Sequence, residues 1–256
     1  MVRVTTTNRR TALRAGAAFA TAGALAAGCA THGAVAHPAP VTRSSGSRAP
    51  TPRHYPAHPT QVTHGPRTRP HVALTFHGGG DPATARALLT EAERHNGRVT
   101  VLAVGTWLDE HPDLARRILD GGHDLGNHTL RHLDINAMSE SEAREEITGC
   151  AQRLKRLTGS IGTWFRPSRA PRASSLVEQL AHSVGYPHVL SYDVDSLDFT
   201  SPGAAAITRK VLGEIRDGSV VSLHFGYADT VAALPAVLEE LDRRGLRAVT
   251  TTELLS

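Results

Sequence analysis

Two histidines of this 256-residue chain, His128 and His132, are four residues apart. On one helical turn this spacing brings both imidazoles to the same face, about 5–6 Å apart. Imidazole nitrogens placed in this way suit a divalent metal ion, and Zn²⁺ is the first candidate. The spacing therefore predicts a metal-binding pair.

Other polar residues that could take part in chemistry stand in four further stretches. These are TFHGGGDP with His77 and Asp81, FRPSR with Arg166, SYDVDSLDF with Asp195, and SLHF with His224. Whether they belong to one site depends on the elements that carry them.

Short β-type apolar segments alternate with amphipathic helical segments from residue 71 onward. The predicted strands cover 71–76, 99–104, 123–127, 188–194, 219–225 and 246–251. The predicted helices lie near 82–95, 111–121, 139–158, 172–184, 203–216 and 230–244. This alternation predicts an α/β domain with a parallel sheet, and six such units favour a small (β/α) barrel.

In a (β/α) barrel the residues that do chemistry lie at the carboxyl ends of the strands. The polar stretches fall at these ends or in the loops that follow, which indicates a single site. Two smaller predictions concern the helix near 139–158. Ser139 and Glu142 form a capping box at its start, and Cys150 lies on its apolar face as a buried structural thiol.

The positive charge of the chain is unevenly distributed. Residues 1–70 contain nine arginines and no Asp, Glu or Lys, although the whole chain has a net charge of +4. Residues 71–256 keep 19 basic and 24 acidic residues, a net charge of −5. The folded part therefore lacks the basic surface of a nucleic-acid-binding protein. It also has no strand-linked Gly-x-Gly-x-x-Gly or Walker loop, so no nucleotide is expected.

The first 29 residues resemble a bacterial export signal. Arg9 and Arg10 precede a moderately apolar segment that ends in LAAGC, with Cys29 as its last residue. This arrangement resembles a twin-arginine signal with a lipobox. It implies an exported protein that a lipid anchor on Cys29 holds at the cell membrane, facing outside; with an ordinary cleaved signal the protein would be secreted.

Residues 30–70 hold eight of the fifteen prolines of the chain. A segment rich in Pro, Ser and Arg cannot bury a core, so it predicts a disordered, extended tether. Residues 71–256 then form the single folded domain.

The polar stretches also resemble the motifs of a known family. LTFHGGGDP, GGHDLGNHTLRH, FRPSR, SYDVDSLDF and SLHF occur in the order of the five motifs of the NodB-type polysaccharide deacetylases, carbohydrate esterase family 4. The resemblance covers 71–256 and implies a distorted (β/α) barrel. It also implies one divalent metal, Zn²⁺ or Co²⁺, which activates a water for attack on an acetyl group of a peptidoglycan or chitin-like polysaccharide.

The resemblance assigns roles to individual residues. It makes His128 and His132 metal ligands and His224 the general acid that protonates the leaving amine. Asp195 resembles the carboxylate that tunes this histidine. Arg166 resembles the arginine that braces the catalytic base.

The first motif departs from the family pattern, which reads Thr-Phe-Asp-Asp-Gly-Pro-x-Pro. His77 stands at the position of the base, and Gly78 stands at the position of the third metal ligand. The third motif is also altered, because Ser168 and Arg169 replace a proline and an aromatic residue. Arg166 thereby loses its expected acidic partner.

Three interpretations follow. A neutral His77 imidazole could act as base or as metal ligand. Alternatively, the flexible glycines could let Asp81 reach the metal. In the third interpretation the site is degenerate, and the barrel binds a glycan or a cell-envelope partner without turnover. We expect a metal-dependent deacetylase in which His77 replaces the usual aspartate.

Overall fold

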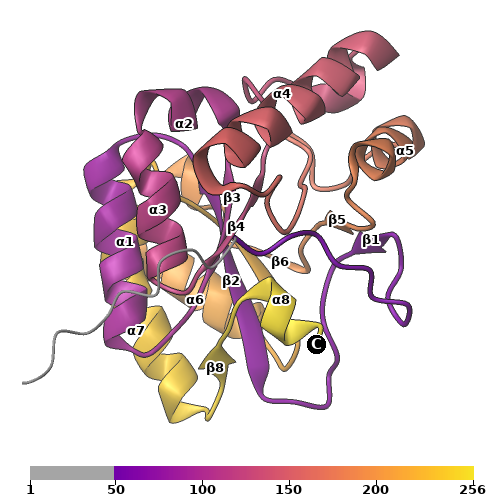
Figure 1. The fold of residues 1–256 in the computed structure, drawn as a ribbon. Helices are drawn as coiled ribbons and strands as arrows, with labels where there is room; N and C mark the ends of the chain where they lie inside the picture. The colour runs from indigo at the N-terminus through magenta and orange to yellow at the C-terminus, as the bar shows by residue number, and fades with distance from the viewer. Residues whose placement is uncertain (1–48) are drawn as a thin grey trace, which may run out of the picture. The chain divides into compact units, whose positions relative to one another are not determined.

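A computed structural model describes residues 49–256. Its strands are β1 (Gln61–Val62), β2 (His71–Gly78), β3 (Thr100–Ala103), β4 (Asp124–Asn127), β5 (Val189–Leu190), β6 (Val194–Asp195), β7 (Val220–His224) and β8 (Arg247–Ala248). All pairings between these strands are parallel. The longest strand, β2, lies at the centre of the sheet (Figure 1).

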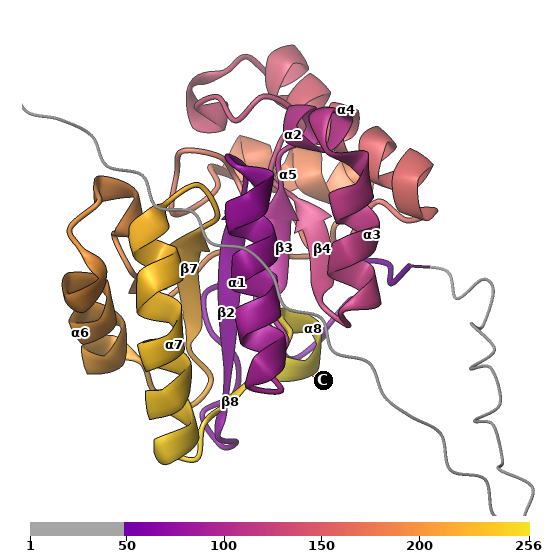
Figure 2. The same cartoon turned by 90° about the vertical axis from the view of Figure 1, so that its left-hand side faces the viewer.

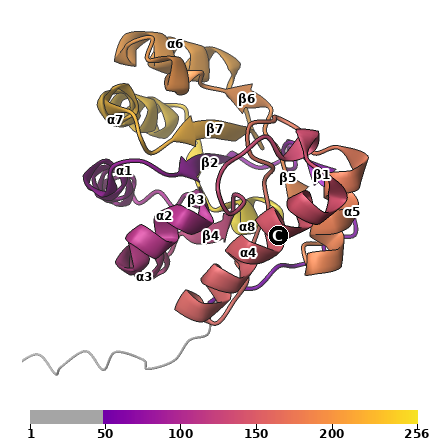
Figure 3. The same cartoon turned by 90° about the horizontal axis from the view of Figure 1, so that it is seen from above.

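The helices of the described part are α1 (Pro82–Arg94), α2 (Gly105–Glu110), α3 (Pro112–Asp120), α4 (Glu140–Thr158), α5 (Ser175–Val184), α6 (Ala204–Glu214), α7 (Ala228–Arg243) and α8 (Thr251–Leu254). Two short 3₁₀ turns, η1 (Ile135–Ala137) and η2 (Asp198–Thr200), follow β4 and β6. Helices α1, α3 and α7 cover one side of the sheet (Figure 2). Seen from above, the helices surround the strands (Figure 3).

The strands form a distorted barrel. The main sheet has the order β4-β3-β2-β7-β6, with β8 also paired to β2. Single bridges from Phe165 to Asn127 and to Val189 connect β4 to β5, which pairs with β1. The predicted (β/α) barrel is therefore confirmed, and its distortion lies where Phe165 takes the place of a full strand.

The predicted elements between 71 and 256 match the structure closely, with three differences. The segment 188–194 forms two very short strands, β5 and β6, instead of one. Helices α2 and α8 were not predicted.

The capping box of Ser139 and Glu142 opens α4 as expected. Cys150 is fully buried, and this burial raises the pKa of its thiol to about 12, as a structural role requires.

Part of the predicted tether instead belongs to the barrel. Val62 of β1 is fully buried and pairs with Leu190. The ring of Tyr55 stacks on Trp164 with centroids 5.6 Å apart, and its backbone N–H donates to Nε2 of His188 at 2.9 Å. The tether prediction is wrong for residues 49–70, because scattered apolar residues among the prolines are enough to cover one side of the barrel.

The remaining N-terminal predictions concern residues before 49. The export signal, Cys29 and residues 30–48 of the tether lie outside the described part of the chain. Among residues 49–256, no helix is long and apolar enough to cross a membrane.

Successive side chains of β2 and β7 point to opposite faces of the sheet, one toward the surrounding helices and the other toward the barrel interior. Val72, Leu74 and Phe76 of β2 belong to the apolar layer that also contains residues of the surrounding helices. The intervening residues face the barrel interior, and the register pairs Ala73 with Val220, Thr75 with Ser222, and His77 with His224. The interior therefore changes from apolar residues through hydroxyls to imidazoles at the carboxyl end.

Candidate active site

His77 and His224 meet because β2 and β7 are parallel neighbours that end together. They are partners in the register, and their ring centroids are 4.3 Å apart. The ring of His128 also adjoins that of His77, with centroids 4.3 Å apart. His77 thus stands between a predicted metal ligand and the predicted general acid.

The loop after β4 carries His128 and His132. Their ring centroids are 4.9 Å apart, so the predicted pair is confirmed as neighbours. The predicted helical turn is wrong, because the loop is irregular, and Thr129 and His132 have positive φ values of 68° and 57°. Asn127 Oδ1 holds the loop by accepting from Thr129 N at 2.9 Å.

A buried acid fixes the far part of this loop. Glu146 of α4 is fully buried and accepts from the backbone N–H of Arg131 at 2.8 Å and from its Nε at 2.6 Å. Because a charged group inside the protein is stable only when paired, this contact holds the segment between the two histidines firmly.

Three histidines form a candidate metal centre. One ring nitrogen each of His77, His128 and His132 lies within 4.8 Å of the others. Nδ1 of His128 bonds to the carbonyl oxygen of Arg166 at 3.1 Å, while its buried Nε2 has no partner. A carbonyl oxygen can only accept, so Nδ1 carries the proton and Nε2 keeps its lone pair. An unpartnered nitrogen beside two others fits Zn²⁺ or Co²⁺ held by three imidazoles.

The protonation state of the cluster also suits a metal. Burial holds the pKa of both His77 and His128 well below the usual range, and neighbouring histidines lower them further. The pKa of His132 is lowered mainly by burial and then by Arg169. Neutral imidazoles are the form that binds a metal ion.

Asp81 does not belong to the cluster. It is the N-cap of α1, where its Oδ1 accepts from the backbone N–H of Ala83 at 2.8 Å. The interpretation in which this aspartate reaches the metal is therefore wrong for this structure. An Asp before Pro82 is a helix-start signal, and the structure uses it as one.

The glycines after His77 differ in their surroundings. A Cβ on Gly78 would lie 3.0 Å from Cα of Ala103 and Cγ1 of Val101, so a side chain there would press on β3. A Cβ on Gly79 would meet nothing within 4 Å. Gly80 has a φ of 81°, and a Cβ there would lie 2.6 Å from Cα of Gly226. A larger residue at the position of the family's third ligand would therefore require the neighbouring part of β3 to move by a few tenths of an ångström.

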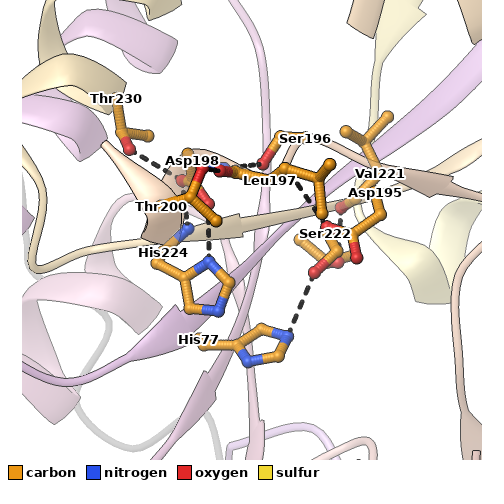
Figure 4. A network of polar contacts seen from close by, with 11 residues as sticks. His77, Asp195, Ser196, Leu197, Asp198, Thr200, Val221, Ser222, His224 and Thr230 are labelled. Atoms are coloured by element: carbon orange, nitrogen blue, oxygen red, sulfur yellow. Dashed lines mark hydrogen bonds and ion pairs between the residues drawn. The ribbon is translucent and has the colours of Figure 1, made fainter. Parts of the chain in front are cut away.

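The carboxylate that orients His224 is Asp198, and the assignment of this role to Asp195 is wrong. Asp198 Oδ1 lies 2.6 Å from Nδ1 of His224, and Oδ2 accepts from the backbone N–H of His224 at 2.8 Å and from Thr230 Oγ1 at 2.7 Å (Figure 4). Burial opposes ionisation of Asp198, but the hydrogen bonds from His224 and Thr230 outweigh it and lower its pKa.

Asp195 lies at the end of β6, where its Oδ1 accepts from the backbone N–H of Leu197 at 3.1 Å (Figure 4). It lines a cavity together with Tyr192. The stretch DSLD contains two aspartates, and the sequence alone did not distinguish them.

Arg166 is fully buried below the cluster. Its Nε donates to the carbonyl of Leu190 at 3.1 Å and its Nη2 to that of Ser191 at 3.0 Å, while Nη1 has no partner. Burial lowers the pKa of this guanidinium to about 10. The predicted loss of an acidic partner is consistent with the unpartnered Nη1.

The altered third motif has a structural role. Ser168 is buried, donates to the carbonyl of Leu133 at 2.5 Å and accepts from Thr129 Oγ1 at 3.0 Å. It therefore connects this motif to the loop of the metal-ligand pair. Arg169 is exposed and has a φ of 54°.

Two cavities open beside the histidines. One, of about 540 Å³, is lined by Gly79, Trp107 and His128 among others, and the second, of about 430 Å³, by Tyr192 and Ser222 among others. Both share the residues His77, His132, His224 and Tyr227. Three large apolar side chains close to the site in sequence are exposed, namely Leu133, Leu197 and Phe199. Of these three, Phe199 lines the second cavity, where its ring offers an apolar surface to a ligand.

Comparisons with known proteins agree with this geometry. Residues 64–189 match the family model described as polysaccharide deacetylase. A peptidoglycan-N-acetylglucosamine deacetylase of Bacillus cereus is 31% identical over 188 residues, which cover 72% of this chain and 87% of that protein. The chain belongs to the polysaccharide deacetylase family. Members of this family hydrolyse N-acetyl amide bonds.

Two other comparisons concern the share of a longer relative that the chain matches and a solved structure with the same fold. A peptidoglycan-N-acetylglucosamine deacetylase of Listeria monocytogenes is 29% identical over 73% of this chain, and the match spans only 39% of that protein. A CE4 family pseudoenzyme of Bacillus anthracis has the same fold, with a TM-score of 0.73 and 23% identity over 78% of this chain and 70% of that one. A mutant of that pseudoenzyme has restored enzymatic activity. The fold therefore occurs in both active and inactive proteins.

Proposed function

We propose that this protein is a metal-dependent deacetylase of an N-acetylated polysaccharide in which His77 replaces the usual aspartates. The observation that carries the proposal is the position of His77. It contributes a nitrogen to the three-histidine cluster, and its ring lies 4.3 Å from that of His224. A metal site and an oriented proton donor therefore adjoin the same cavities.

Different residues of the chain have different roles in the proposed amide hydrolysis. His77, His128 and His132 would hold a divalent metal ion, which would supply Lewis-acid chemistry and a nucleophilic water near neutral pH, so that a separate carboxylate base would not be required. His224 provides the proton for the leaving amine through Nε2, because Asp198 holds its Nδ1–H.

The cavity walls position the substrate in this proposal. Trp107 Nε1 donates to the carbonyl of Gly80 at 2.8 Å and so fixes the glycine loop beside His77. The ring of Phe199, 46% exposed, lies 5.4 Å from that of His224 and offers a surface for one face of a sugar. A polymeric substrate fits two adjoining open cavities better than an enclosed one.

Peptidoglycan is the substrate that we favour, with a chitin-like chain as the second choice. Both relatives described above are named for deacetylation of N-acetylglucosamine in peptidoglycan. We further propose that the chain is exported and attached to the outer side of the cell membrane by a lipid on Cys29. Such an anchor would hold the barrel next to the cell wall.

A non-catalytic barrel is the second candidate function. It is favoured by the absence of an acidic residue at 77 and 78 and by the unpartnered Nη1 of Arg166. In that case the cavities would bind a glycan or a cell-envelope partner without turnover. A fold that also occurs in a pseudoenzyme is compatible with this alternative.

Acetate release distinguishes the two candidates. Purified protein is incubated with chitooligosaccharides and with peptidoglycan fragments, with and without a chelator, and His224→Ala is the matched control. We expect chelator-sensitive acetate release that this variant loses. Absence of acetate on both substrates, together with glycan retention that is the same in the variant, would establish the binding function instead.

A further inference from the structure

Ser222 stands inside the barrel one layer below the imidazoles. It lies in the middle of β7, is 1% exposed and pairs with Thr75 of β2 on one side and Asp195 of β6 on the other. Its backbone carbonyl accepts from Ser196 N at 3.2 Å. The backbone of Ser222 is therefore hydrogen-bonded within the sheet. Ser222 also lines the second cavity, to which its hydroxyl points.

The hydroxyl of Ser222 contacts the unusual residue of the site. Its Oγ lies 3.3 Å from Nε2 of His77, and Figure 4 shows the two side chains facing each other. Neighbouring strands bring them together, because Ser222 is the register partner of Thr75, two residues before His77.

His77, His128 and His224 each have one ring nitrogen occupied by a protein partner. Nδ1 of His128 contacts a backbone carbonyl, and Nδ1 of His224 contacts Asp198. For His77 the occupied nitrogen is Nε2, so its partner stands on the opposite side of the ring. A metal-ligating histidine commonly donates its other N–H to such a partner, which fixes the tautomer and the ring orientation.

We propose that Ser222 is a positioning residue that accepts a hydrogen bond from Nε2–H of His77 and thereby directs Nδ1 of His77 to the metal. This inference rests on the proposed function. It explains how an imidazole can serve at a position where the family has a carboxylate: a carboxylate needs no fixed tautomer, whereas an imidazole does.

The hydroxyl of Ser222 differs chemically from the partners of His128 and His224. A carbonyl oxygen and a carboxylate accept only, and so they fix the tautomer of His128 and His224 absolutely. A hydroxyl both donates and accepts, so Ser222 can satisfy His77 in either tautomer. His77 therefore keeps a partner before metal binding, and the metal selects the tautomer with a free Nδ1.

Metal affinity and the tautomer itself test the proposal. Zn²⁺ affinity is measured by competition with a chromophoric chelator for wild type, Ser222→Ala and Ser222→Thr. We expect about 10- to 100-fold weaker binding for the alanine variant and a return toward wild-type affinity for the threonine variant, which keeps a hydroxyl. Long-range ¹H–¹⁵N correlation spectra of the Zn²⁺-loaded protein should show the proton of His77 on Nε2.

A second serine provides the matched control. Ser219 is also buried and directly precedes β7, but its Oγ contacts Asp193 and Arg67 away from the histidines. Ser219→Ala should leave the Zn²⁺ affinity unchanged. Circular dichroism of each variant confirms that it is folded. Should Ser222→Ala unfold, the position of the His77 proton in the wild-type protein still decides the proposal.

The outcomes separate this inference from the proposed function. Wild-type protein that binds no Zn²⁺ would contradict the metal-dependent function itself. Wild-type binding that Ser222→Ala leaves unchanged, or a proton found on Nδ1 of His77, would overturn only the role of Ser222. Labelling of Ser222 by a fluorophosphonate probe would also overturn it, because the serine would then act as a nucleophile.

Discussion

The ends of β4 and β2 meet at one site but are built differently. After β4, His128 and His132 sit in a loop held by contacts to Asn127 and Glu146. At the end of β2, His77 and Gly78 are followed by Gly79 and Gly80, and a Cβ on Gly79 would meet nothing within 4 Å. The two histidines of the β4 loop are therefore positioned by side-chain hydrogen bonds to that loop, whereas His77 is positioned by its strand and by the register of β2 with β7.

The largest effect is expected when the side chain of His77, which the end of β2 contributes to the site, is removed. His77→Ala should reduce acetate release to the level of the buffer, because both the third ligand and the neighbour of His224 are lost. Asp81→Ala should keep the rate within a few-fold and lose about 0.5–2 kcal/mol of stability, the usual cost of an N-cap. Steady-state kinetics and thermal unfolding measure the two effects. A full rate in His77→Ala with a lost rate in Asp81→Ala would reverse our assignment.

The next largest effect concerns the two aspartates after β6. Asp198→Asn should slow hydrolysis by up to about 10²- to 10⁴-fold, the range for loss of general acid catalysis, because His224 loses the acceptor that fixes its tautomer. Asp195→Asn is the control and should change the rate far less, since the carboxylate that contacts His224 is Asp198 and not Asp195. The measurement is kcat for both variants on the same substrate. Equal losses would show that Asp195 acts on the reaction directly.

A smaller effect distinguishes the glycines of the β2 end. Gly78→Ala should cost about 1–3 kcal/mol of unfolding free energy, because the added methyl presses on Ala103 and Val101. Gly79→Ala should stay within about 0.5 kcal/mol, since its Cβ meets nothing. Urea unfolding of the two variants measures the difference. If both were equally stable, the β2 end would be less constrained than the contacts of Gly78 indicate.

A further prediction concerns the pH dependence of stability in the metal-free protein. His77 and His128 have a folded pKa well below the value of 6.5 for an unperturbed imidazole. Below pH 6.5 the unfolded chain therefore binds protons that the folded chain does not, and stability falls as the pH falls. Each group contributes up to about 1.4 kcal/mol per pH unit. Above pH 6.5 both states are neutral, and this contribution is constant.

Urea unfolding between pH 5 and 8 in the presence of a chelator tests this slope. His77→Ala should show a shallower pH dependence than wild type. His182→Ala, at an exposed histidine of α5, should match wild type. A wild-type slope that His77→Ala leaves unchanged would mean that the buried imidazoles do not titrate as the structure indicates.

Most of the fold could be predicted because alternating strand and helix patterns are local signals. The packing of residues 49–70 could not be predicted, because it depends on Trp164 and His188, which lie more than a hundred residues away in the sequence. The same limit applies to β5 and β6, which are too short to show a period.

The candidate site was predictable in its residue types but not in its detailed contacts. His77, His128, His132 and His224 meet as expected. The choice of Asp198 over Asp195, however, depends on which side chain of one short turn points inward. The contact between Ser222 and His77 depends on the register of β2 and β7, and a single sequence does not carry that register.

Metal content tests the central claim most directly. The protein is purified without added metal, dialysed against a weak chelator and analysed by mass spectrometry for bound Zn²⁺ and Co²⁺, beside His77→Ala prepared in the same way. We predict one equivalent of metal per wild-type chain and its loss in the variant. A wild-type chain without metal, or a variant that keeps a full equivalent, would contradict the claim that His77 completes the metal site.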